Sequence, residues 1–110
     1  MATSVRGDQQ TVVTVTIDAN TGKASPDPFH VSKSAKQHVV WVCNDPNAEF
    51  AVEFVGETPF SGKHFHKHSP SSGPVPDHVP AGDKKLYKYN LTITRGGSAK
   101  TYDPNGQVDP

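Results

Sequence analysis

The sequence predicts a single all-β domain, a β-sandwich of about six to eight strands, and three observations support this. Apolar and polar residues alternate with a period of two in several short segments, which is typical of strands with one buried face. Turn-forming residues separate these segments. No segment carries a helical stripe of apolar residues of useful length. The length of 110 residues suits one domain, residues 1–110.

The first half of the chain contains three expected strands. Residues 11–19, TVVTVTIDA, alternate valine or isoleucine with threonine, so that the apolar side chains share one face. Residues 29–32, FHVS, form a short extended piece after two prolines. Residues 37–45, QHVVWVCND, are rich in β-prone residues and predict a central strand that ends at the Asn-Asp-Pro turn. We expect residues 1–10 to form a flexible tail.

The second half contributes the remaining strands. Residues 49–56, EFAVEFVG, direct phenylalanine and valine to one face. Residues 86–95, LYKYNLTITR, do the same with tyrosine, leucine and isoleucine, while lysine, asparagine and threonine face water. Gly96 and Gly97 predict a hairpin turn, after which residues 100–108 supply a last short strand.

One long loop, residues 56–83, interrupts this pattern. It contains five prolines and four of the six histidines of the chain, and its prolines and glycines exclude a long regular element. Loops of this length inside a compact domain are usually functional or mobile. The length of this loop therefore makes it the first place to expect a functional site.

Two segments resemble parts of a known family. Residues 26–45, PDPFHVSKSAKQHVVWVCND, resemble the opening half of a cupredoxin-like domain, where a Pro-Phe strand and a turn lead into a V-x-W-x-N strand. Residues 81–91, AGDKKLYKYNL, resemble the approach to the copper-binding loop of that family. The resemblance covers residues 11–95 and implies a Greek-key sandwich.

The same resemblance implies that the blue-copper ligand set is lacking. Such a site needs two imidazoles and a thiolate around the metal. Leu91 stands where the resemblance would place the cysteine ligand, and residues 92–110 contain neither histidine nor methionine. The only cysteine, Cys43, lies next but one to Trp41 in the expected central strand, where we interpret it as a small apolar filler.

A relocated metal site is one interpretation of the loop. In an extended segment His64, His66 and His68 would point to the same side and share zinc, copper or nickel, with His78 as a further ligand. The neighbouring lysines Lys63 and Lys67 oppose a bound cation. The other interpretation is a solvated basic loop, whose Phe60 and Phe65 tuck onto the edge of the sandwich.

Other function classes are disfavoured. Eleven basic and eleven acidic residues cancel, so the overall charge does not favour nucleic acid. No apolar segment is long enough for a membrane span or a signal peptide, which makes the cytoplasm the default location. A periplasmic or secreted location stays open for a chain whose leader has been removed. The sequence contains no G-x-S-x-G elbow, phosphate-binding glycine loop or exposed reactive cysteine, so we do not expect an enzyme.

Two hypotheses of function follow. The first is a non-catalytic recognition or assembly module without a cofactor, in which the long loop contacts a protein partner or a second copy of the chain. The second is a transition-metal-binding protein that uses the histidines of the loop. The residues expected to contact a partner are Phe60, Phe65, Pro70, Pro74 and Pro76.

Overall fold

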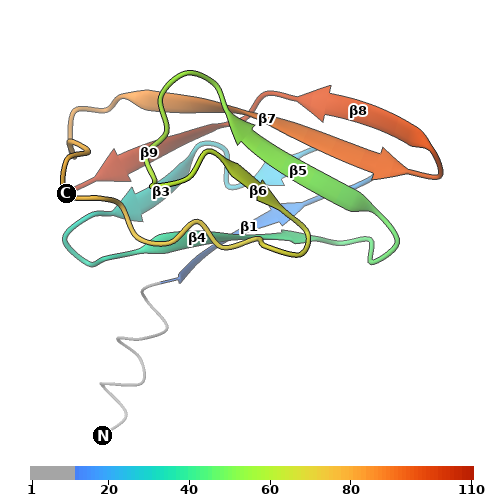
Figure 1. Cartoon of the computed structure of the whole chain (residues 1–110), viewed down its shortest axis with the longest axis horizontal. Coiled ribbons are helices and arrows are strands. Elements are labelled where there is room, and N and C mark those ends of the chain that lie inside the picture. Colours follow the sequence, from blue (N-terminus) through green and yellow to red (C-terminus); the bar gives the residue numbers. More distant parts are fainter. Residues whose placement is uncertain (1–11) are drawn as a thin grey trace, which may run out of the picture.

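A computed structural model describes residues 12–110, and it confirms the all-β prediction (Figure 1). Nine strands are present in this part of the chain, one more than expected. The tail predicted for residues 1–10 lies outside the described residues. The strands are β1 (Val12–Ile17), β2 (Ala24–Ser25), β3 (Phe29–Ser32), β4 (His38–Cys43), β5 (Glu49–Phe54), β6 (His64–His66), β7 (Leu86–Arg95), β8 (Ser98–Tyr102) and β9 (Asn105–Asp109).

The strands form two sheets that both contain parallel and antiparallel pairs. The smaller sheet has the order β2-β1-β4, with β1 parallel to β4 and antiparallel to β2. The larger sheet has the order β3-β9-β7-β5-β6, and β8 pairs with the second half of β7. The β7–β8 hairpin extends to the end of the molecule opposite the C-terminus (Figure 1). No helix that could cross a membrane occurs in the described residues.

The core between the two sheets is dominated by aromatic side chains. Trp41 and Tyr89 are 1% and 0% exposed, and the indole Nε1 of Trp41 donates a hydrogen bond of 3.4 Å to the Tyr89 hydroxyl. The rings of Phe29 and Phe54 pack edge-on against Trp41, with centroid distances of 6.1 and 6.3 Å. Burial raises the pKa of Tyr89 far above its ordinary value. The alternating apolar residues predicted to face inward on β5 and β7 are buried, as expected.

The prediction that residues 37–45 form a central strand is wrong in one respect. β4 lies at the edge of the smaller sheet, because β1 is its only strand partner within residues 12–110. The long loop covers the other side of β4: the N–H of Trp41 donates to the carbonyl of Pro70, and the N–H of Ser72 donates to the carbonyl of Val39. The side chain of Cys43 is half-buried and packs against the core.

The long loop, residues 56–83, is folded onto the sandwich. It contains β6, which pairs antiparallel with β5. Phe60 and Phe65 are 1% and 7% exposed and belong to the aromatic core, and Val75 and Val79 are buried as well. The two phenylalanines therefore pack onto the sandwich as expected, but they lie in its core and not at its edge.

Replacement of Phe60 tests whether the loop is part of the core. We expect Phe60→Ala to lower the free energy of unfolding by about 3 to 5 kcal/mol, because the ring leaves a cavity among Phe29, Phe54 and Phe65. The matched loop variant Lys63→Ala removes an exposed side chain and should cost less than about 0.5 kcal/mol. Urea denaturation followed by circular dichroism measures both. Equal stability of the two variants would show that the loop is not packed in solution.

Candidate functional site

The three alternate histidines do not form one cluster. His64 and His66 are exposed on the same face of β6, opposite Glu53 and Ala51 of β5. Phe65 lies between them and points into the core. His68 follows in a turn, where its backbone N–H donates to Nδ1 of His66 over 3.2 Å and the two imidazole rings lie 6.3 Å apart. The structure thus places His64 and His66 on one face of the strand and brings the ring of His68 beside that of His66 alone.

The fourth histidine lies elsewhere in the loop. His78 is exposed and lines a hollow with Glu57, Thr58, Pro80 and other residues. No three histidine, cysteine, aspartate or glutamate side chains within residues 12–110 form a group that could hold a metal ion.

The residues expected to contact a partner are divided between the core and the surface. The rings of Phe60 and Phe65 are buried, so a protein docked on the folded surface does not reach them. Pro74 is exposed, whereas Pro70 and Pro76 are half-buried. The surface that the loop offers to a partner is therefore less apolar than the sequence predicts.

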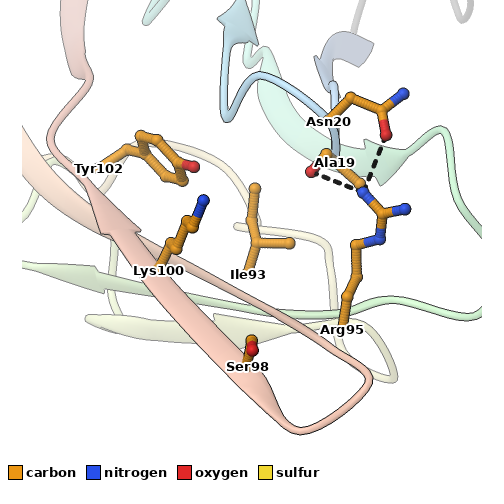
Figure 2. Close-up of a pocket in the computed structure, with 7 residues that line it drawn as sticks. All are labelled: Ala19, Asn20, Ile93, Arg95, Ser98, Lys100 and Tyr102. Atoms are coloured by element: carbon orange, nitrogen blue, oxygen red, sulfur yellow. Dashed lines mark hydrogen bonds between the residues drawn. The ribbon is translucent and has the colours of Figure 1, made fainter.

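A pocket that the sequence analysis did not predict lies between β8 and the turn that follows β1. We call it the flank pocket; its volume is about 240 Å³ (Figure 2). It opens where the β7–β8 hairpin extends past the smaller sheet. The residues that line it are Ala19, Asn20, Ile93, Arg95, Ser98, Lys100 and Tyr102.

One wall of the flank pocket is the β7–β8 hairpin. Its turn residues, Gly96 and Gly97, have φ angles of 53° and 83°, the left-handed values required by a two-residue turn of type I′. The pairing register places Lys100 opposite Ile93, a buried residue of β7. Because directly paired residues share a face of a sheet, Lys100 continues the inward face of the sandwich at a point where its side chain is exposed.

The other wall is the turn of residues 18–23. The carboxylate of Asp18 accepts hydrogen bonds from the backbone N–H groups of Asn20 and Thr21, at 2.9 and 3.4 Å. These bonds lower the pKa of Asp18 below its ordinary value. Gly22 lies against the ring of Tyr102, and a Cβ atom there would come within 2.0 Å of the ring. The glycine therefore lets the turn pack closely on the end of β8.

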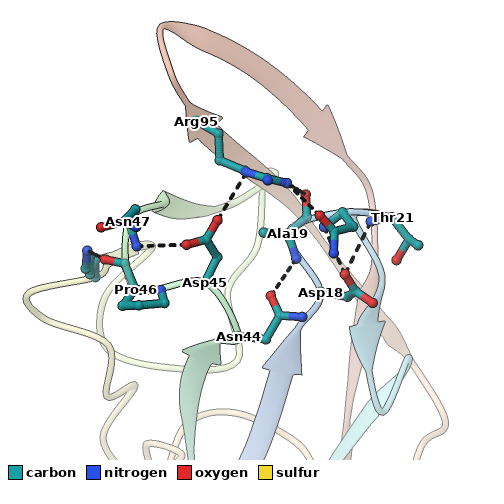
Figure 3. Close-up of polar contacts among 10 residues, drawn as sticks. Asp18, Ala19, Thr21, Asn44, Asp45, Pro46, Asn47 and Arg95 are labelled. Carbon is teal, nitrogen blue, oxygen red and sulfur yellow. Dashed lines mark hydrogen bonds and ion pairs between the residues drawn. The ribbon is translucent and has the colours of Figure 1, made fainter.

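Arg95 holds the loops around the flank pocket in place. Its Nη1 donates to the carbonyl of Ala19 at 3.1 Å and to Oδ1 of Asn20 at 2.9 Å. Its Nε lies 3.2 Å from Oδ2 of Asp45, which also accepts a bond from the N–H of Asn47 through Oδ1 (Figure 3). One guanidinium thus joins the end of β7 to the turns that follow β1 and β4. Its charge is already compensated by Asp45.

Lys100 is the cation that remains free for a ligand. Within residues 12–110 its ammonium group makes no ion pair, and no carboxylate lines the flank pocket. Figure 2 shows the amine directed into the pocket, on the same side as the hydroxyl of Tyr102 and beside Ile93. The pocket therefore combines one positive charge, hydroxyl groups and an apolar floor. This combination suits a small anionic group with an apolar stem.

A signal for this site exists in the sequence, although it is a weak one. In residues 98–102, SAKTY, every second side chain is serine, lysine or tyrosine, and these are the residues that face inward. Lys100 is paired with Ile93 on the apolar face of β7. A lysine in such a position indicates that this part of the sheet face is open to solvent. Finding it requires the register of the β7–β8 hairpin, which starts at the two glycines.

The chain matches none of the protein-family models, curated proteins or solved structures with which it was compared. The resemblance to cupredoxin-like domains therefore stays a prediction.

The charge of Asp18 should stabilise the turn that forms the pocket wall. Because the folded-state pKa is depressed, this stabilisation is present above the ordinary pKa, near pH 4, and is lost as the pH falls through the lower folded value. We expect Asp18→Ala to lower the thermal midpoint at pH 7, and its difference from the wild type should shrink as the pH falls through the folded-state pKa of Asp18. Asp18→Asn, which keeps an acceptor oxygen, should fall between them at pH 7. Midpoint differences that do not change with pH would contradict this role of the charge.

Proposed function

We propose that the protein is a non-catalytic recognition module, a cupredoxin-like sandwich without a copper centre, which binds a carboxylate-bearing segment of a protein partner in the flank pocket. The observation that carries this proposal is the free ammonium group of Lys100 in a pocket without a carboxylate. A fixed pocket with one uncompensated charge is a specific receptor for one opposite charge.

The charge of the pocket favours a carboxylate over a phosphate. One free ammonium group balances a carboxylate of charge −1, whereas a phosphate monoester carries about −1.5 to −2 at neutral pH. The hydroxyl groups of Ser98 and Tyr102 supply hydrogen-bond donors for the second carboxylate oxygen. The Arg95 bonds to Ala19, Asn20 and Asp45 fix the walls before the ligand arrives, so that less ordering is needed on binding.

The flank pocket is favoured over the exposed part of the long loop as the binding surface. The loop uses its large apolar side chains, Phe60, Phe65, Val75 and Val79, to complete the core. Of the polar side chains that line the flank pocket, Arg95 and Asn20 bond to each other, whereas the ammonium group of Lys100 makes no ion pair within residues 12–110. A recognition role for the loop would have to rest on its prolines and exposed histidines.

Titration with N-acetylglutamate α-amide, which carries a single carboxylate, tests the proposed function. We expect a dissociation constant on the order of millimolar, because an exposed ion pair contributes little free energy. The amide signals that shift in nuclear magnetic resonance spectra should be those of residues 18–23 and 98–102. The neutral glutamine analogue should not produce these shifts.

Two charge-reversal variants distinguish the flank pocket from the long loop. Lys100→Glu should weaken binding of the glutamate probe at least about tenfold, because it replaces attraction by repulsion. Lys63→Glu makes the same change of net charge in the loop and should leave binding unchanged. If Lys63→Glu abolishes binding and Lys100→Glu does not, the loop is the recognition surface and the flank pocket is not.

A second candidate function, transition-metal binding, is favoured by the placement of His64 and His66 on one exposed face of β6. Two imidazoles at alternate positions of a strand can bind one zinc, copper or nickel ion, and His68 is the nearest third ligand. The carboxylate of Glu49, with Oε1 4.0 Å from Nε2 of His68, is the nearest acidic group to that imidazole among the recorded ion pairs.

Metal titration of protein purified without a metal-affinity column tests this second function. If the histidines form a site, zinc should raise the thermal midpoint, and the variant His64→Ala/His66→Ala/His68→Ala should lose that increase. His78→Ala is the matched control, since this histidine lies outside the group and should leave the effect intact. An unchanged zinc affinity in the triple variant would rule out a site at these residues.

A further inference from the structure

The outer edge of β8 is an unpaired strand edge beside the flank pocket. β8 pairs only with β7, and within the described residues no strand pairs with its other side. In a hairpin with a two-residue turn, Ser98, Lys100 and Tyr102 exchange backbone hydrogen bonds with β7. The N–H and carbonyl groups of Ala99 and Thr101 therefore point outward, where an added strand would meet them.

The other sheet edges are less accessible. β4 is covered by Pro70 and Ser72 of the long loop, and β6 is closed by the turn that bridges His66 and Ser69. β2 has two residues and β3 has four, whereas β8 has five. Among the strands with an open edge, β8 is thus the longest, and unpaired edges are templates for strand addition.

A strand added to β8 would place alternate side chains in the flank pocket. Successive side chains of a strand point to opposite faces, so every second residue of the added segment faces the inward side, where Lys100 and Tyr102 lie. The intervening residues would lie on the outer face beside Ala99 and Thr101. The pocket would therefore contact every second side chain of the added strand, and the free ammonium group of Lys100 favours an acidic side chain at that position.

The charge at this edge disfavours a second copy of the chain as the occupant. Antiparallel pairing of two β8 strands would bring the Lys100 side chains of both copies to the same face and close to each other. Like charges facing each other across a strand pair are destabilising, and the flank pocket contains no carboxylate to compensate them.

We propose that the partner segment is an extended acidic peptide that adds to the outer edge of β8 as a further strand and places a glutamate or aspartate side chain in the flank pocket. This inference rests on the proposed function, because it uses the same pocket. It adds main-chain hydrogen bonds to the N–H and carbonyl groups of Ala99 and Thr101, which supply affinity that a lone carboxylate lacks.

Substitution of Thr101 by proline tests strand addition. The probe is an acetylated and amidated peptide of about seven residues, alternating threonine and valine around a central glutamate. Thr101→Pro removes one outward N–H without removing a bond to β7, and proline is tolerated at this position of an edge strand. We expect it to weaken binding of the peptide about fivefold to tenfold. Thr101→Val removes the same hydroxyl group, which contacts Thr92, but keeps the N–H and should bind like the wild type.

A second measurement uses the unchanged protein and separates strand addition from the proposed function. N-methylation of the peptide amides on the paired edge should weaken binding as Thr101→Pro does, since it removes the same kind of hydrogen bond from the other side. Binding of N-acetylglutamate α-amide should be the same in Thr101→Pro and the wild type. If the N-methylated and unmodified peptides bind equally, strand addition is refuted while the carboxylate pocket stands. If neither probe binds, the proposed function fails as well.

Sedimentation equilibrium tests whether a second copy of the chain pairs with the edge of β8. We expect the wild type to stay monomeric at concentrations that saturate the peptide probe. A wild-type dimer that Thr101→Pro converts to a monomer would assign the β8 edge to a second copy of the chain and overturn the proposal of an acidic partner.

Discussion

The packing of one group of aromatic rings between two small sheets determines how the rest of this chain is arranged. Four of the rings come from strands of both sheets, and two come from the long loop. The rings are packed so closely that only glycine fits at position 106 of β9, since a Cβ atom on Gly106 would lie 2.1 Å from the ring of Phe29. A sandwich of 110 residues with 33% hydrophobic residues thus obtains its core by recruiting its loop. The rings are those of Phe29, Trp41, Phe54, Phe60, Phe65 and Tyr89.

The concentration of apolar side chains around these rings leaves the opposite end of the sandwich uncovered. There the inward face of β8 carries Ser98, Lys100 and Tyr102, and polar bonds replace apolar packing. At this end Arg95 holds the two sheets together. Its bonds join the turns that follow β1 and β4 of the smaller sheet to the end of β7. The two ends of the sandwich are therefore stabilised in different ways, one by the packing of rings and the other by the polar bonds of Arg95.

Most of the strands could be predicted from the sequence, because alternation over six or more residues depends only on which face is buried. The position of β4 in its sheet could not, since a β-prone segment such as HVVWVC is equally compatible with a centre or with an edge that another segment covers. The spacing of the histidines in the loop predicted one extended segment, yet the strand ends at His66 and His68 lies in the turn that follows. The flank pocket depends on the register of the β7–β8 hairpin, which Gly96 and Gly97 set locally, and on the position of the turn of residues 18–23, which the local sequence does not encode.

The contacts that Pro70 and Ser72 make along β4 also bear on the tendency of the protein to aggregate. A valine-rich strand with an open edge, as β4 would be without these contacts, is a starting point for uncontrolled pairing between molecules. Pro70 accepts a hydrogen bond from the N–H of Trp41 through its carbonyl, but it has no N–H of its own. It therefore covers this edge of β4 without offering a donor to a further strand. These two loop contacts therefore cover an edge that would otherwise be open to pairing with other molecules.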